Sequence, residues 1–266
     1  MTLQRQPTNP AEVYEHCFVP ALFAQWGPVT AAAARIGPGD HVLDVACGTG
    51  VLAGAAAERA GPRGTVVGLD VNPQMLAVAR ASQRPVEWVE APAEALPFAD
   101  ATFDAVVSQF GLMFFDDRAG ALREMRRVAR PRGRIAVTVC DNIRHSAGYS
   151  AFAQLLDRLF GRGVGDAFRA PFALGDAEVL KRLATEAGLP GAAVARRSGD
   201  VSFPSVASLV STERACAWTL GGILDEGQFE HLLEAAETEL APFAREDGSI
   251  VFEMPALILT ARMDGP

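Results

Sequence analysis

Residues 42–50 are Val-Leu-Asp-Val-Ala-Cys-Gly-Thr-Gly, an apolar segment that leads directly into a turn with two glycines. Short apolar runs bounded by turn residues are typical of strands that are buried on both faces of a sheet. Glycine has no Cβ atom, so a ligand can lie against bare peptide where such a strand ends. The stretch therefore predicts the first strand of a parallel sheet, a helix after the turn, and a ligand site between them.

The same alternation of apolar runs and helical stretches continues to about residue 140. Strands are expected at 42–46, 65–69, 86–89, 105–108 and 135–139. Gly61-Pro62 would end the first helix, and Asn72 would cap the second with Pro73 at its first position. The pattern predicts an α/β fold, namely a Rossmann-like, doubly wound, mostly parallel sheet of about seven strands with helical insertions that act as a lid.

Beyond residue 140 the alternation becomes irregular. Helical insertions are expected at about 142–173 and 205–240, a helix at 176–187, and a weaker strand at 193–203. The last apolar stretch, 249–262, contains Pro255, so an edge or bent strand is expected rather than a central one. We expect one structural domain with three parts: an N-terminal helical cap at 1–40, a cofactor-binding core at 41–140, and the rest of the sheet with its insertions at 141–266.

Composition argues against several classes of protein. A net charge of −8 is the wrong sign for binding phosphate backbones. The chain has no apolar run of membrane-spanning length, and its N-terminus lacks a secretory pattern. We therefore expect a cytoplasmic protein with a small-molecule substrate and neither a nucleic-acid nor a membrane partner; the oligomeric state stays open.

A required metal ion is not expected. The four cysteines have no paired spacing that suits zinc. Asp141-Asn142, after the fifth strand, is similar to the acid-amide pair of magnesium-dependent catechol-type O-methyltransferases, but Gln109 stands where those enzymes have a further acid. Too little negative charge is left for a hard cation.

A second acid accompanies the glycine turn. Asp70 ends the apolar run 65–69 and lies 22 residues after Gly48. In nucleotide-binding α/β folds, an acid at about this spacing accepts hydrogen bonds from the ribose hydroxyls. The turn and Asp70 together predict a cofactor that contains a nucleoside.

Asp44 distinguishes between two cofactor classes. Gly48, Gly50 and Ala53 also satisfy the G-x-G-x-x-G/A pattern of nicotinamide sites. Asp44 lies four residues before the first glycine and would direct a negative charge toward the turn, where it would repel a pyrophosphate. S-adenosylmethionine has no phosphate, and its ammonium and sulfonium groups are cationic, so we expect that cofactor. A phosphate-bearing cofactor and a purely structural turn, with Asp44 as a helix cap, remain alternatives.

Four motifs occur in order along the core. They are Asp-x-Ala-Cys-Gly-Thr-Gly at 44–50, Val-Gly-Leu-Asp-Val-Asn-Pro-Gln-Met-Leu at 67–76, Ala-Glu-Ala-Leu-Pro-Phe at 93–98 with Phe-Asp-Ala-Val-Val-Ser at 103–108, and Val-Ala-Arg-Pro-Arg-Gly-Arg at 128–134. With these motifs, residues 42–139 resemble the class I S-adenosylmethionine-dependent methyltransferases, especially those of ubiquinone and menaquinone biosynthesis. The resemblance implies a methyltransferase, and it implies that the fourth motif is a turn before the fifth strand.

The resemblance also implies roles for individual positions. Residues 46–48, which include Ala46 and Cys47, would hold the methionine part, Asp70 the ribose, and Val71 and Met75 the adenine. The amide of Ala93 would donate to the adenine ring. Pro92 stands where the family commonly has an acid, so either apolar packing and the Ala93 amide suffice for the adenine or Glu94 acts as the substitute. The full set of expected cofactor-binding residues is Tyr14, Asp44, Ala46, Cys47, Gly48, Gly50, Asp70, Val71, Met75, Ala93, Glu94 and Gln109.

The resemblance further implies residues that line or cover the reaction site. Gln109 and Phe110 fall where the family lines the passage between cofactor and acceptor, and Tyr14 lies in an N-terminal segment that often folds over the cofactor in the family. Because a methyl group is displaced in line from an activated sulfonium, positioning supplies much of the catalysis. A hydroxyl acceptor would need a base, and His145 is the best-placed candidate. The alternative is that His145 is an exposed loop histidine.

The predicted function is therefore methyl transfer to oxygen, nitrogen or carbon of a small metabolite. Aromatic residues in the insertions favour an apolar or aromatic acceptor, although they would pack equally well within a lid. Two alternatives are kept: a nicotinamide-dependent oxidoreductase, and a methyltransferase-like protein that catalyses another reaction, such as a cyclisation.

Overall fold

The structure is a computed structural model that describes residues 9–216 and 219–265 of the 266-residue chain. The described chain divides into two compact units. The sheet unit comprises residues 24–142, 172–199 and 255–265, and the insertion unit comprises 9–23, 143–171 and 200–254 without 217–218. Each unit is described separately below.

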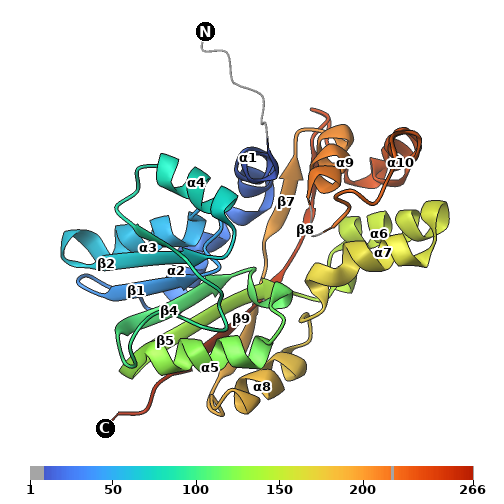
Figure 1. The fold of residues 1–266 in the computed structure, drawn as a ribbon. Coiled ribbons are helices and arrows are strands. Elements are labelled where there is room, and N and C mark those ends of the chain that lie inside the picture. Colours follow the sequence, from blue (N-terminus) through green and yellow to red (C-terminus); the bar gives the residue numbers. More distant parts are fainter. Residues whose placement is uncertain (1–8, 217–218, 266) are drawn as a thin grey trace. The chain divides into compact units, whose positions relative to one another are not determined.

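The sheet unit is built on a seven-stranded sheet, as predicted (Figure 1). The first five strands along the chain are parallel, and β9 runs antiparallel between β5 and β6. The spatial order is β3 (Glu87–Glu90), β2 (Thr65–Asp70), β1 (His41–Val45), β4 (Phe103–Gln109), β5 (Ala129–Cys140), β9 (Ala256–Arg262) and β6 (Ala193–Arg197). This doubly wound arrangement confirms the predicted fold class.

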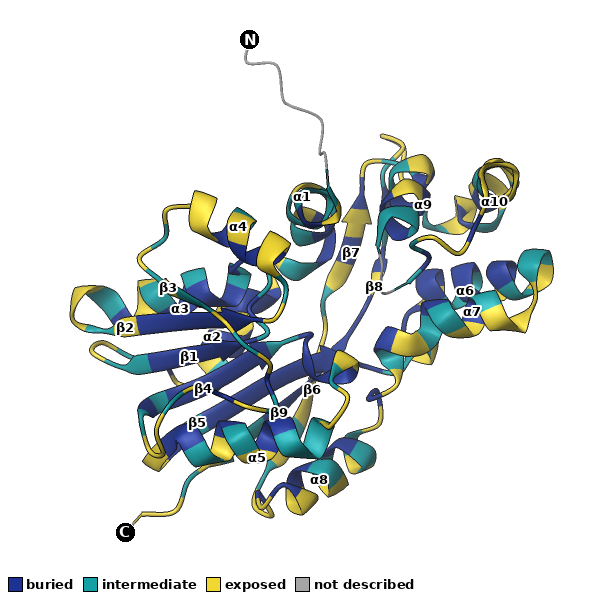
Figure 2. Ribbon diagram, viewed as in Figure 1, coloured by how far each residue is buried: buried dark blue, intermediate teal, exposed yellow. Residues whose placement is uncertain are grey.

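Helices cover both faces of the sheet. Helices α2 (Trp26–Ala33) and α3 (Val51–Ala60) share one apolar core with β1, β2, β4 and β5. Helices α5 (Arg118–Val128) and α8 (Ala177–Glu186) lie on the opposite face, and α4 (Pro73–Ala81) connects β2 to β3. The inner strands are almost wholly buried, as Figure 2 shows. Their apolar runs are therefore explained by burial on both sides.

Helix boundaries follow the residues expected to set them. The side chain of Asn72 accepts hydrogen bonds from the backbone of Gln74 and Met75, and Pro73 occupies the first helical position of α4. Helix α3 ends at Ala60, and Gly61 follows with a φ of 64°. Short 3-10 turns occupy Gly61–Arg63, Leu112–Phe114, Ile143–His145, Ala170–Phe172 and Ala241–Phe243.

The C-terminal apolar stretch corrects one prediction. It forms two strands, β8 (Ile250–Glu253) and β9, and β9 lies inside the sheet rather than at its edge. Pro255 falls in the break between them, so its missing N–H removes no ladder hydrogen bond, and its carbonyl accepts the amide of Asp141 at 3.1 Å.

Two further predictions are adjusted. The stretch 193–203 is not one strand, because β6 joins the large sheet while β7 (Asp200–Phe203) pairs with β8 in a separate two-stranded sheet. Residues 129–134 of the fourth motif lie within β5 rather than before it. The register with β4 is irregular there: Phe103 pairs with Ala129 but Ala105 with Arg134. The irregularity accommodates the turn residues inside the strand.

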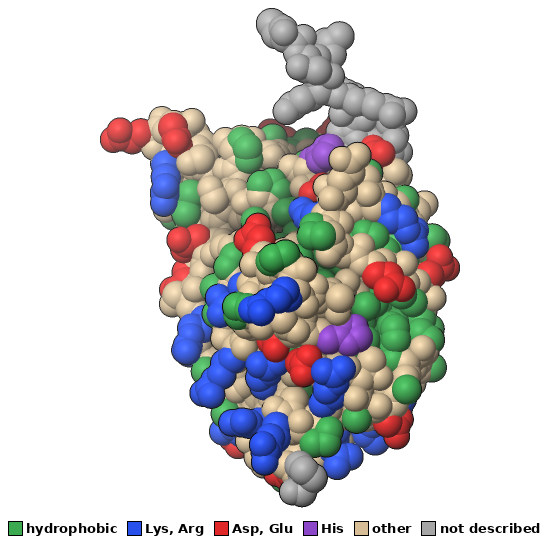
Figure 3. All heavy atoms as spheres, turned by 90° about the vertical axis from the view of Figure 1, so that its left-hand side faces the viewer, with side chains coloured by type: hydrophobic (Ala, Val, Ile, Leu, Met, Phe, Trp, Pro, Cys, Tyr) green, Lys and Arg blue, Asp and Glu red, His purple; other side chains and the backbone are tan. Residues whose placement is uncertain are grey.

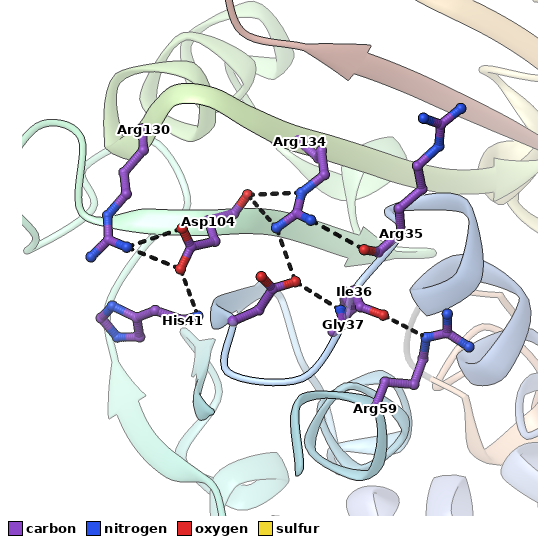
Figure 4. A network of polar contacts seen from close by, with 9 residues as sticks. Arg35, Ile36, Gly37, His41, Arg59, Asp104, Arg130 and Arg134 are labelled. Carbon is purple, nitrogen blue, oxygen red and sulfur yellow. Dashed lines mark hydrogen bonds and ion pairs between the residues drawn. The ribbon is translucent and has the colours of Figure 1, made fainter. Parts of the chain in front are cut away.

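A polar network holds the amino ends of β1 and β4 together (Figure 4). Asp104 accepts the His41 amide at 2.9 Å and pairs with Arg130 at 3.0 Å. The Arg134 guanidinium donates to the Asp104 carbonyl and pairs with Asp40 at 2.9 Å. Burial raises the pKa of the Asp104 carboxyl, but the His41 amide and the Arg130 guanidinium outweigh burial and hold this pKa below its usual value. This network lies at the opposite end of the strands from the glycine turn.

The insertion unit is mainly helical, as predicted for 142–173 and 205–240. Its elements are α1 (Pro10–Val13), a π-helix (Tyr14–Phe23), α6 (Ala147–Phe160), α7 (Arg162–Arg169), α9 (Val206–Ala215), α10 (Glu226–Glu239), β7 and β8. Aromatic rings form its core: Tyr149 packs edge-on against Phe168 and Phe252, and Phe152 against Phe168.

One acid is buried in this aromatic core. Glu213 is 2% exposed, and its carboxylate accepts a hydrogen bond from the Thr219 hydroxyl at 2.9 Å and another from Tyr149. Burial raises the pKa of Glu213 to about 7 despite these two hydrogen bonds.

Among the helices of the described residues, none combines the length and apolarity needed to cross a bilayer. Basic and acidic side chains are interspersed with hydrophobic ones on the face drawn in Figure 3.

Candidate cofactor site

The candidate site lies where neighbouring strands β1 and β4 end. Chain connections leave these two strands in opposite directions along the sheet, and ligands of doubly wound folds bind at such a point. Ala46 and Phe110 follow the two strands with φ values of 57° and 52°, a left-handed conformation that is unfavourable for residues other than glycine. A Cβ atom added to Gly111 would lie 2.6 Å from the Cβ of Ala46, so the two loops touch. Backbone strain thus coincides with the switch point.

The glycine turn is tightly hydrogen-bonded. The Cys47 amide donates to the Leu69 carbonyl at 2.9 Å, and the Gly50 amide donates to the Cys47 carbonyl at 2.9 Å. Gly48 and Gly50 have φ values of 56° and 89°, and Gly50 is the cap from which α3 begins. Both glycines are therefore required by the backbone itself.

Asp70 is fixed beside this turn. One carboxylate oxygen accepts the Gly48 amide at 2.8 Å, and the other accepts the Asn72 amide at 2.8 Å. The side chain is 9% exposed, and burial raises its pKa even though the amide bonds act in the opposite direction. Each carboxylate oxygen has further lone pairs with which it can accept a ligand hydroxyl.

Asp44 is buried behind the same turn. It is 0% exposed, and neither carboxylate oxygen has a hydrogen-bond partner among the described residues. Burial raises the pKa of Asp44 well above its usual value, and the charge of Asp70 adds to the rise. The Ala53 backbone, which lies outside ordinary hydrogen-bond geometry, opposes the rise only in part. The protein alone therefore favours a neutral Asp44, and a nearby cation would favour its ionised form.

Other groups around the turn share this electrostatic character. Burial, together with the charges of Asp44 and Asp70, raises the pKa of the Cys47 thiol well above its usual value. The hydroxyls of Thr49 and Ser108 are buried without hydrogen-bond partners in the part of the chain that the structure describes. Orphaned polar atoms and crowded acids at one place are typical of a site that a polar, positively charged ligand completes.

The expected adenine contacts lie next to this acid cluster. Val71 directly follows Asp70 and is 66% exposed, an unusual position for a valine, whereas Met75 in the first turn of α4 is 4% exposed. The Ala91 amide donates to the Asp70 carbonyl at 3.2 Å, which brings the segment with buried Ala93 and partly buried Glu94 to the end of β2. Gln109 is the last residue of β4 and is partly buried.

Sequence reasoning missed two residues that contact the turn. The Trp88 ring lies against Gly50 and Gly68, and the Arg84 guanidinium donates to the Thr49 carbonyl at 2.8 Å. A signal was available, because Trp88 and Gly68 are register partners on β3 and β2. A large aromatic beside a strand glycine commonly fills the space that the glycine leaves.

Tyr14 and His145 belong to the insertion unit, so their predicted roles at the cofactor stay predictions. The Tyr14 ring stacks on Phe23 with centroids 5.2 Å apart and is tilted against Phe18 at 6.2 Å. His145 is exposed in the turn Ile143–His145. Of the described His, Cys, Asp and Glu side chains, no three are grouped so as to hold a metal ion.

Comparison with known proteins agrees with the motifs. Residues 43–137 match the family described as "Methyltransferase domain". An uncharacterized protein of Mycobacterium tuberculosis is 45% identical over 120 residues, which are 44% of this chain and 43% of that protein. The ubiquinone/menaquinone biosynthesis C-methyltransferase UbiE of Burkholderia pseudomallei is 45% identical over 121 residues, 44% of this chain and 49% of the relative. The chain thus matches less than half the length of these relatives.

A solved structure extends the likeness to most of the chain. A putative methyltransferase from Bacillus halodurans has a TM-score of 0.60 at 18% identity, over 90% of this chain and 98% of that one. At this identity the likeness shows a shared fold. Residues 43–137 thus match the family described as a methyltransferase domain and are similar in sequence to UbiE, within a chain that shares the fold of the solved structure.

Proposed function

We propose that this chain transfers the methyl group of S-adenosylmethionine to a small apolar or aromatic metabolite by in-line displacement. The observation that carries the proposal is the pair of buried carboxyl groups, Asp44 and Asp70, beside the turn between β1 and α3 of a methyltransferase domain. Two acids at this place favour a positively charged ligand and disfavour a diphosphate.

The residues at the turn fit the cofactor's parts. The peptide groups of Ala46, Cys47 and Gly48 would hold the methionine part, with the Asp44 carboxylate compensating its ammonium charge. Asp70 would accept both ribose hydroxyls with the lone pairs left beside its two amide donors. Because those amides already hold the carboxylate in place, little ordering remains to be paid for on binding.

The adenine would lie between the apolar side chains of Val71 and Met75. Covering Val71, which is 66% exposed, would remove apolar surface from water. The Ala93 amide would donate to a ring nitrogen, and Glu94 would accept the exocyclic amino group. This assignment is supported by the contact that brings residue 91 to the end of β2.

Methyl transfer itself asks little chemistry of the protein. The sulfonium supplies an activated methyl group whose thioether leaves without help from an acid. Gln109 ends β4, and Phe110 follows it in the loop whose Gly111 touches Ala46; both side chains would align the acceptor and exclude water from its path. His145 is the proposed base where the acceptor is a hydroxyl.

The acceptor class is drawn from relatives and from the insertions. The matched UbiE relative is named for C-methylation in ubiquinone and menaquinone biosynthesis. Aromatic side chains dominate the core of the insertion unit. We propose a quinone-like ring as the first acceptor to test, with residues 1–40 as a cap and the two helical insertions as a substrate lid.

Calorimetry with the intact chain tests the cofactor assignment. S-adenosylmethionine and S-adenosylhomocysteine should both bind, NADH should not, and Asp70→Ala should abolish binding. Production of S-adenosylhomocysteine with quinone-like phenols then tests the reaction. Cofactor binding without this product in the presence of any acceptor would favour a non-methylating reaction, and NADH binding in its place would overturn the proposal.

A further inference from the structure

The glycines around the cofactor turn are surrounded by two side chains of the same unit. A Cβ atom on Gly50 would lie 2.4 Å from Cη2 of Trp88 and 3.1 Å from Nη1 of Arg84. On Gly68 it would lie 2.5 Å from Cζ3 of Trp88, and on Gly54 it would lie 3.0 Å from Cδ and Nε of Arg84. Three glycines in three different elements therefore make room for only two side chains.

Arg84 holds the turn by a specific hydrogen bond. Its Nη1 donates to the Thr49 carbonyl at 2.8 Å, and Gly54 one turn into α3 leaves space for its aliphatic stem. The acceptor is a main-chain carbonyl of the turn rather than a carboxylate, and Arg84 as a residue is only partly exposed. A charged donor to a carbonyl is among the stronger hydrogen bonds of proteins.

Trp88 supports the same turn by packing. It is half-buried on edge strand β3, pairs with Gly68 in register, and reaches across β2 to the first residue before α3. The Cys47 sulfur lies 3.1 Å from the Cβ position of Gly68, so the ring and the thiol meet over that glycine. The ring thus occupies one side of the turn, while the Asp70 carboxylate contacts it through Gly48.

We propose that Arg84 and Trp88 are positioning residues that hold the turn 47–50 in its binding conformation before the cofactor arrives. The inference rests on the proposed function, because it assumes that this turn is the cofactor loop. It also gives the glycines a role apart from ligand contact, since Gly50, Gly54 and Gly68 accommodate the two supporting side chains. Neither side chain needs to touch the cofactor for its loss to weaken binding.

Amide hydrogen exchange of the unliganded protein tests the bracing directly. Arg84→Met keeps the aliphatic stem and removes the hydrogen bond, and Trp88→Leu removes the ring. Both should raise exchange at the amides of residues 47–50 by about ten-fold. Arg84→Met should change the midpoint of global unfolding little, whereas Trp88→Leu should also lower it, because the ring packs against the core. Arg63→Met, which removes an exposed arginine at the other end of α3, is the matched control and should leave exchange unchanged.

Binding and kinetics then test the consequence. Arg84→Met should weaken S-adenosylhomocysteine binding and raise KM for S-adenosylmethionine by about ten-fold, with kcat within about two-fold of wild type. Arg84→Lys should recover part of the affinity because an ammonium can still donate to the Thr49 carbonyl. Wild-type exchange and wild-type affinity in both Arg84→Met and Trp88→Leu would overturn the inference while leaving the proposed function intact. Failure of the wild-type chain to bind the cofactor would instead overturn the proposed function and, with it, the inference.

Discussion

Replacing Asp70 by Asn separates the two tasks that the structure gives to this carboxylate. Both oxygens accept backbone amides at 2.8 Å, from Gly48 on one side and Asn72 on the other. An asparagine has one acceptor oxygen, so its NH2 group must face one of these two N–H donors. One hydrogen bond to a charged group is lost and a buried amide is left without an acceptor, which together cost about 2–3 kcal/mol. Because burial raises the pKa of Asp70, removal of its charge offsets part of this cost at pH 7, and the net loss should be about 1–2 kcal/mol.

The same substitution removes the charged acceptor proposed for the ribose. Loss of that hydrogen bond should weaken S-adenosylhomocysteine binding by about 10- to 100-fold, which corresponds to about 1.4–2.8 kcal/mol. Stability would be measured by urea denaturation and affinity by calorimetry on the same preparations. Glu58→Gln, an exposed carboxylate on α3, is the control for loss of one negative charge in this unit and should change neither quantity.

The two readouts make the reasoning refutable. A fall in stability with unchanged affinity would leave Asp70 as an anchor of the turn and would refute its role at the ribose. Unchanged stability would refute the account of the two amide hydrogen bonds.

Three further substitutions give independent checks. Burial raises the Glu213 pKa to about 7, so the folded state loses stability as pH rises from about 4.5 through 7 and the carboxyl group ionises. In thermal melts, Glu213→Gln should therefore be more stable than wild type by about 1–3 kcal/mol at pH 8.5 and differ little from it at pH 4.5. The lowered pKa of Asp104 contributes stability that is present above its unfolded pKa of about 4 and is lost as pH falls through the folded value. In urea titrations, Asp104→Asn should cost about 1–2 kcal/mol at pH 7 and less toward pH 3. A cost that does not change with pH would contradict this role of the ionised carboxylate. Gly54→Ala should gain up to about 1 kcal/mol of helix propensity yet weaken cofactor binding, because the new Cβ would meet the Arg84 stem at 3.0 Å; affinity equal to wild type would contradict this account.

Helix-capping residues and short apolar runs made much of the fold predictable from the sequence. Asn72 and Pro73 set the start of α4 by chemistry that acts within four residues, and the apolar runs of β1 and β2 identified buried strands. The place of β9 was not predictable in this way. Pro255 argued against a central strand, and only the tertiary arrangement shows that the proline lies in a break between β8 and β9.

In the candidate site, too, the residues identified by sequence spacing were predictable and the features that depend on tertiary contacts were not. Spacing along the first two sequence motifs pointed to Asp44, Gly48 and Asp70, which the fold brings together around one turn. The protonation of Asp44 depends on burial by residues distant in sequence, so the sequence suggested a fixed negative charge where burial favours the neutral acid. Arg84 and Trp88 were missed because they lie more than 30 residues after Thr49 and Gly50 in the sequence and meet them only in the folded sheet unit.

The proposed charge compensation between Asp44 and the cofactor's ammonium is checked by counting the protons released on binding, because a neutral Asp44 must lose its proton to take this role. Calorimetry of S-adenosylhomocysteine binding in two buffers of different ionisation enthalpy should show net proton release at pH values below the raised pKa of Asp44 in the free protein, and Asp44→Asn should abolish it and weaken binding. Tight binding to Asp44→Asn, or preferential binding of NADH by the wild-type chain, would contradict a site built for a cationic, unphosphorylated nucleoside.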